Sequence, residues 1–62
     1  MTDDERRRLR HDLRSPLTIV AGFAELLASE REISDELRRD YAERILTAAQ
    51  ELRAMLDALF EA

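Results

Sequence analysis

The sequence predicts an all-α protein: an antiparallel two-helix hairpin that dimerises into a four-helix bundle. Helix formers dominate it, with ten Leu, nine Ala and charged residues that are mostly Glu and Arg, whereas Gly and Pro occur once each. Two long stretches place apolar residues alternately four and three positions apart, which is the spacing of a helical seam. The segment between them is so short that the two helices must be antiparallel neighbours.

The first helix is expected over residues 3–28. Thr2 and Glu5 have the spacing of a capping box, and Asp3 and Asp4 suit the positive end of a helix dipole. The seam of this helix consists of Leu9, Leu13, Pro16, Val20, Phe23 and Leu27.

The second helix is expected over residues 35–61, after a turn at 29–34. The apolar spacing stops at "SEREIS" (29–34), where Ser34 can cap a helix whose first turn contains Asp35 and Glu36. The second seam consists of Tyr41, Ile45, Ala48, Leu52, Met55 and Leu59. The chain is then one small domain, residues 1–62.

The apolar stripe on each helix is wider than one seam. Further apolar residues flank the seams: Leu17, Ile19, Ala24 and Leu26 on the first helix, and Ala42, Ala49, Leu56 and Ala58 on the second. Such a width on both helices is typical of a four-helix bundle, which a homodimer of hairpins would complete. The alternative is that neighbouring parts of a longer protein cover the stripe.

Composition and charge argue against several kinds of site. A net charge of −4 makes nucleic acid an unexpected partner. There is no Cys, and a single His without partners predicts no metal or cofactor bound by this chain. The longest mainly apolar stretch, residues 17–28, is too short to span a bilayer and contains Glu25, and no signal peptide is visible. Direct membrane insertion is therefore not expected.

The run "RRRLR" (6–10) is strongly basic by itself. Because Asp3 and Asp4 precede it, ion pairs at i,i+4 are expected between Asp3 and Arg7 and between Asp4 and Arg8. This arrangement predicts a solvated helix face.

The turn around His11 combines several unusual features. In the heptad frame of the first seam, His11 points away from the seam, Asp12 lies at its edge, and Ser15 is one turn farther along the face of His11. Pro16 cannot donate a hydrogen bond to the Asp12 carbonyl, so it loosens the helix in this turn. Each feature alone is common on helices, but together they indicate a functional site.

The segment "HDLRSPL" (11–17) resembles the histidine box of HisKA-type sensor histidine kinases, a His, an acid, Leu, Arg, Thr or Asn, Pro and Leu in succession. The resemblance continues through "TIVAGFAELL" (18–27) and "YAERILTAAQELRAMLDALF" (41–60). It implies the dimerisation and histidine-phosphotransfer domain of a two-component sensor kinase, with the same hairpin dimer as its fold.

The resemblance also implies roles for the residues of the box. His11 is then the phospho-acceptor, Asp12 is the acid that orients the imidazole and acts as general base, and Pro16 is a hinge in the helix. Ser15 stands where the family has Thr or Asn, whose side chain helps to position the water that hydrolyses the phosphoryl group on the response regulator. Ser keeps the hydroxyl of Thr and lacks the methyl group that restricts its rotamers.

The partners implied by the resemblance lie outside this chain. A single Gly cannot make a Gly-rich phosphate loop, so ATP and magnesium are expected to come with a separate ATP-binding catalytic domain, and the chain is expected to be part of a histidine kinase. The start of the chain ten residues before His11 favours a piece of a longer kinase. Its expected location is cytoplasmic.

A response regulator receiver domain is the other implied partner. Its expected docking surface consists of Thr18, Ile19, Gly22, Phe23 and Leu46, since Leu46 lies near the level of Thr18 on the neighbouring helix. The alternative is that Leu46 packs sideways in a broad core. Two alternative functions stay open: a stand-alone phosphotransfer protein of a phosphorelay and a purely structural dimerisation hairpin.

Overall fold

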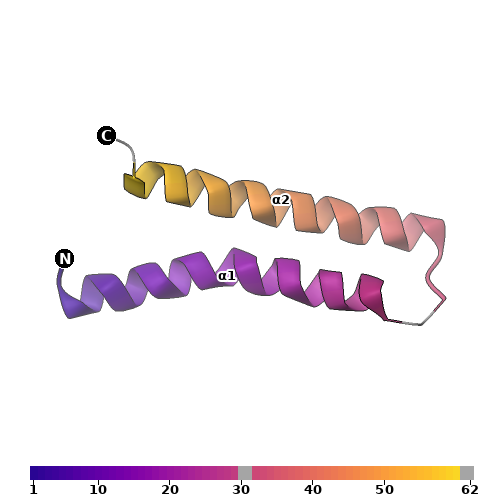
Figure 1. Ribbon diagram of the computed structural model, residues 1–62, viewed down its shortest axis with the longest axis horizontal. Helices are drawn as coiled ribbons and strands as arrows, with labels where there is room; N and C mark the ends of the chain where they lie inside the picture. Colours follow the sequence, from indigo (N-terminus) through magenta and orange to yellow (C-terminus); the bar gives the residue numbers. More distant parts are fainter. Residues whose placement is uncertain (30–31, 61–62) are drawn as a thin grey trace.

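The computed structural model describes residues 1–29 and 32–60, which form two helices (Figure 1). Helix α1 spans Asp3–Ala28 and helix α2 spans Asp35–Phe60. The helices pack against each other and run in opposite directions, so that the start of α1 and the end of α2 lie at the same end of the hairpin (Figure 1). The expected all-α hairpin is confirmed. Residues 30–31 of the expected turn and residue 61 of the expected second helix lie outside the described residues.

Side-chain caps begin both helices. The Glu5 backbone N–H donates to Thr2 Oγ1 at 3.1 Å, and the Thr2 N–H donates to Glu5 Oε1 at 3.2 Å, which completes the expected capping box. At α2, the Leu37 N–H donates to Ser34 Oγ at 3.2 Å. These bonds satisfy backbone donors that have no partner inside a helix, and they explain why the helices begin at these residues.

The core is a single seam between the two helices. Among the described residues only Pro16 and Ala48 are buried, and Ala48 is 3% exposed. The other expected seam residues are half-buried: Leu9, Leu13, Val20, Phe23 and Leu27 on α1, and Tyr41, Ile45, Leu52 and Met55 on α2.

Leu59 is the exception to the expected seam, because it is 39% exposed. It lies in the last turn of α2, opposite the first turns of α1. The seam position one turn before Leu9 is Arg6, so α1 offers Leu59 no apolar partner there. The prediction that Leu59 packs in the hairpin seam is wrong for this reason.

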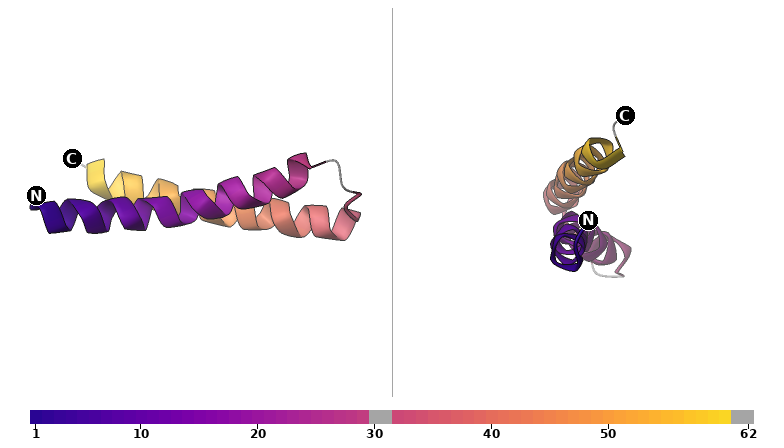
Figure 2. Two further views of the ribbon diagram at one scale, coloured as in Figure 1. Left: turned by 90° about the horizontal axis from the view of Figure 1, so that it is seen from below. Right: turned by 90° about the vertical axis from the view of Figure 1, so that its left-hand side faces the viewer.

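The hairpin is one helix layer thick, with extents of 46 × 22 × 12 Å (Figure 2). The axes of the two antiparallel helices cross at a small angle (Figure 2). The apolar residues that flank the seams remain exposed, among them Leu17 at 53%, Ile19 at 42% and Leu56 at 40%. A layer this thin therefore has apolar side chains that its own partner helix does not cover.

Candidate functional site

His11 lies on the outer face of α1, where α2 does not reach. Its side chain is 86% exposed and that of Asp12 is 57% exposed. The sequence places His11 on this face because the seam residues Leu9, Leu13 and Pro16 point toward α2, which leaves the positions between them facing outward. A partner can therefore approach the imidazole directly.

Asp12 lies on the Nδ1 side of the imidazole. The distance between His11 Nδ1 and Asp12 Oδ1 is 3.8 Å, which is longer than a hydrogen bond. Both side chains are exposed, so a small rotation can bring the carboxylate within hydrogen-bonding distance. A carboxylate at Nδ1 favours the tautomer with the proton on Nδ1, and this tautomer leaves the Nε2 lone pair available to a reacting group.

Helix α1 bends near its middle (Figure 1). Pro16 lies inside this helix, near the midpoint of its range. Pro16 lacks an N–H and is buried against α2. Thr18 adds a second bending feature, because its hydroxyl donates to the Arg14 carbonyl at 2.9 Å. Both bending features thus follow His11 along α1, and the sequence analysis had not anticipated the contribution of Thr18.

Four of the five residues expected to dock a partner line one surface hollow. Thr18, Ile19, Gly22 and Phe23 lie around it, with Leu26 as the fifth lining residue. A Cβ added at Gly22 would meet no atom within 4 Å apart from its chain neighbours and the backbone of its own helix, so the space above Gly22 is open.

Leu46 lies apart from this hollow. It is 57% exposed and lines neither this hollow nor the neighbouring one between the helices. The level of Leu46 along the hairpin is as expected, but on α2 the side facing Ile19 and Phe23 is formed by Asp40, Arg44 and Thr47. The hollow therefore brings together the four α1 residues and not Leu46, because a shared level along the hairpin does not imply a shared face. Ser15 is exposed on α1, one turn beyond His11.

A cluster of aromatic and charged residues connects the helices beside this hollow. The Phe23 and Tyr41 rings lie 5.2 Å apart between centroids, and the Arg44 guanidinium lies 5.7 Å from the centroid of Phe23. Asp40 Oδ2 accepts a hydrogen bond from Arg44 Nε at 3.0 Å, which orients the guanidinium. Sequence analysis missed Arg44, although its i,i+4 spacing from Asp40 was a readable signal.

The described residues contain neither a cluster of metal ligands nor a membrane-spanning helix. Within residues 1–29 and 32–60 there is no group of three or more His, Cys, Asp or Glu side chains that could hold a metal ion. Neither helix, over the part of the chain that the structure describes, is long and apolar enough to cross a membrane.

Comparison with known proteins places these features in a family. The model of the His Kinase A (phospho-acceptor) domain matches residues 7–62. The sensor protein VanSC of Enterococcus gallinarum is 43% identical over 53 residues, which cover 86% of this chain and 15% of that protein. No solved structure matches. The histidine box, the hairpin and these matches agree, and the chain belongs to the His Kinase A (phospho-acceptor) domain family.

Proposed function

We propose that this chain is the phospho-accepting and dimerisation domain of a sensor histidine kinase and that His11 accepts the phosphoryl group. The observation that carries the proposal is the exposed His11–Asp12 pair on a helix of this family. The phosphoryl donor would be ATP held by a separate catalytic domain, which would also supply magnesium, because the described residues offer no cluster of metal ligands. The final acceptor would be an aspartate of a response regulator, in the cytoplasm where ATP is found.

The chemistry follows from the geometry at His11. Nε2 attacks the γ-phosphorus of ATP, a nitrogen–phosphorus bond forms, and the bond from phosphorus to the β,γ-bridging oxygen breaks, so that ADP leaves. The imidazole then carries substituents on both nitrogens, and Asp12 accepts the Nδ1 proton. In the second step an aspartate carboxylate of the regulator attacks phosphorus, the nitrogen–phosphorus bond breaks, and Asp12 returns the proton to Nδ1.

Dimerisation would cover the exposed apolar side chains of the hairpin. Leu17 and Leu56 are among those exposed on the one-layer structure, and a second hairpin would bury them in a four-helix bundle. Light scattering should give twice the chain mass of 7.2 kDa at micromolar concentration, with melting that depends on concentration. A folded monomer under these conditions would rule out the dimer.

The receiver domain would dock at the hollow lined by Thr18, Ile19, Gly22 and Phe23. This surface lies on α1 beyond the bend, on the same helix as His11. Chemical-shift changes in these residues upon addition of the cognate regulator, without changes at Leu46, would support the site. Changes centred on Leu46 instead would reject it.

The phosphotransfer itself is tested by supplying a catalytic domain of this family with ATP and magnesium. An acid-labile label should map to His11, and the His11→Ala protein should take up none while keeping its helical content. If the His11→Ala protein is labelled as strongly as the wild type, His11 is not the acceptor. Labelling from a phosphorylated receiver but not from a catalytic domain would instead indicate a stand-alone phosphotransfer protein.

A further inference from the structure

Positive charge is concentrated around His11 although the chain as a whole is negative. Residues 6–14 contain five of the ten arginines and one acid, Asp12, which gives this stretch a charge of +4 on a chain of net charge −4. Such a local excess attracts anions to this part of the surface.

Arg7 and Arg8 lie on the His11 side of α1. They precede His11 by four and three residues, the spacings that bring side chains together on a helix. With Asp4 and His11 they line one surface hollow. The imidazole therefore shares a shallow depression with two arginines that precede it by one turn of the helix.

The ion pairs expected for these arginines do not form. The ion pairs of the described residues that involve an arginine are Arg38–Asp35 and Arg44–Asp40. The predicted Asp3–Arg7 and Asp4–Arg8 pairs are wrong, because exposed pairs gain little and immobilise long side chains, and the first-turn carboxylates are already stabilised by the helix N-terminus. Neither guanidinium is thus occupied by a carboxylate of the described residues.

We propose that Arg7 and Arg8 form, with His11, a binding site for a phosphate group. The ligand is either the phosphoryl group on His11 or the terminal phosphate of the incoming donor, and both present the same anionic oxygens to the guanidinium groups. Asp4 opposes the anion from the same hollow, and Asp12 does so from beside the imidazole. The inference rests on the proposed function in taking His11 as the phospho-acceptor.

Phosphoramidate tests the site without any catalytic domain. When it labels an imidazole, a nitrogen–phosphorus bond forms, the bond from phosphorus to ammonia breaks, and ammonia leaves. Phosphoramidate labelling thus tests the arginine site without a catalytic domain. A failure of labelling from ATP would count against the proposed function instead. At low salt, the double variant Arg7→Gln/Arg8→Gln should be labelled about 3- to 10-fold more slowly than the wild type, since two nearby positive charges are lost. High salt should remove most of the difference.

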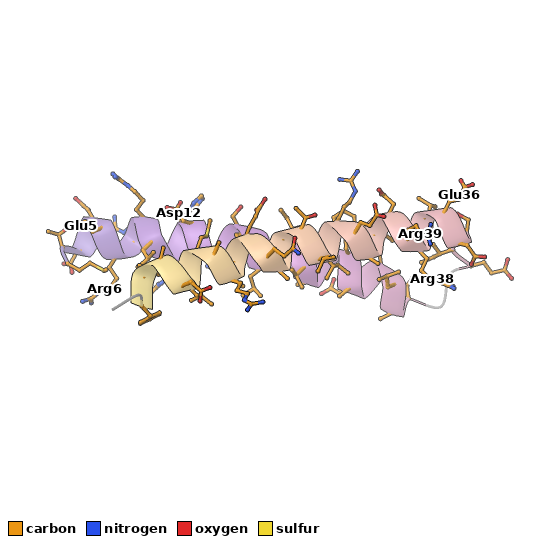
Figure 3. All side chains as sticks on the ribbon, turned by 90° about the horizontal axis from the view of Figure 1, so that it is seen from above. Glu5, Arg6, Asp12, Glu36, Arg38 and Arg39 are labelled. Atoms are coloured by element: carbon orange, nitrogen blue, oxygen red, sulfur yellow. The ribbon has the colours of Figure 1, made fainter. Side chains whose placement is uncertain are left out.

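The matched control is Arg38→Gln/Arg39→Gln, which makes the same change of charge at the opposite end of the hairpin from Asp12 (Figure 3). It should be labelled at the wild-type rate. Asp4→Asn should act in the other direction and accelerate labelling. Equal slowing in both double variants would overturn the site, as would no slowing in either, provided that circular dichroism shows both folded.

The source of the phosphate is distinguished by the arginine Nε–Hε resonances. If the Nε–Hε resonances of Arg7 and Arg8 shift only after His11 is phosphorylated, the site holds the phosphoryl group on the imidazole. If inorganic phosphate also shifts them in the unmodified chain, the site takes phosphate from solution, as an incoming donor requires. If neither treatment shifts them, the arginines are only a solvated face and the inference is wrong.

Discussion

The two halves of the hairpin use their polar side chains differently. Toward the loop, Phe23 of α1 contacts Tyr41 and Arg44 of α2, and Asp40 orients Arg44, so aromatic and charged groups connect the helices. Toward the chain ends, His11 and Asp12 pair on the outer face of α1 alone. The half near the loop therefore adds aromatic and charged contacts to the apolar seam, while the half with His11 keeps its reactive groups off the interface.

The boundary between the halves lies at Pro16 and Ala48, the two residues that are buried within 1–29 and 32–60. The Phe23–Tyr41 contact sets the register of the hairpin, and in this register Pro16 and Ala48 lie at the same level. The small side chain of Ala48 opposite the ring of Pro16 lets the two helices approach closely where α1 bends. Flexing of the bend would move His11 while the packed half stays in place.

The largest expected effect is on the chemistry of the exposed half. Asp12→Asn should slow the labelling of His11 from ATP by about 10²–10⁴-fold, because the amide cannot accept the Nδ1 proton. The thermal unfolding curve should be unchanged, since the side chain is exposed and off the seam. Asp57→Asn, an exposed change on α2, should leave the labelling rate unaltered. An Asp12→Asn rate equal to the wild-type rate would remove Asp12 from the mechanism.

The next effect is on the stability of the half near the loop, and the two phenylalanines test it. Phe23→Ala should lower the free energy of unfolding by about 2–3 kcal/mol, less than for a fully buried ring because Phe23 is half-buried. Phe60 is 81% exposed, so Phe60→Ala should lower the free energy of unfolding by less than about 0.5 kcal/mol. Denaturant melts measure both, and similar losses at the two sites would contradict the division into halves.

Pro16→Ala tests the boundary. It restores a backbone donor to the Asp12 carbonyl and should stabilise the hairpin by about 1–2 kcal/mol, less than the full helix penalty of proline because the buried ring contacts are lost. The labelling of His11 from ATP should slow if the bend is needed for catalysis. A more stable protein with unchanged labelling would show that the bend serves packing alone.

The smallest effect concerns the first turn of α1. The pKa of Glu5 is lowered below its ordinary value of 4.5. The hydrogen bond with the Thr2 backbone contributes most to this shift, and the hydrogen bond with the Thr2 side chain contributes less. A lowered folded pKa means that the cap stabilises the helix above pH 4.5, and that this contribution is lost as the pH falls through the lowered value. The protection factors of the amides in residues 3–6, which correct for the intrinsic pH dependence of exchange, should therefore fall in acid in the wild type. In Glu5→Gln the pH dependence should be weaker.

Local features of the sequence determined the helices and the identity of the site. Capping pairs are three residues apart, so the Thr2–Glu5 and Ser34–Leu37 bonds depend on little beyond their own turn. The seam period placed His11 outside and Pro16 inside, because facing on a helix follows from spacing alone. The histidine box was readable for the same reason, since its residues are consecutive on one helix.

The tertiary structure decided what depends on the second helix or on competing partners. Spacing gave the level of Leu46 but not its side of the hairpin, which follows from how α2 is rotated against α1. The exposure of Leu59 depends on Arg6 at the far end of the other helix. The arginines before His11 had carboxylates at the right spacing and still did not pair, because solvation and side-chain entropy offset so weak an attraction. Contacts within one helical turn are specified by neighbouring residues, whereas contacts across the hairpin depend on rotation and register, which the local sequence does not encode.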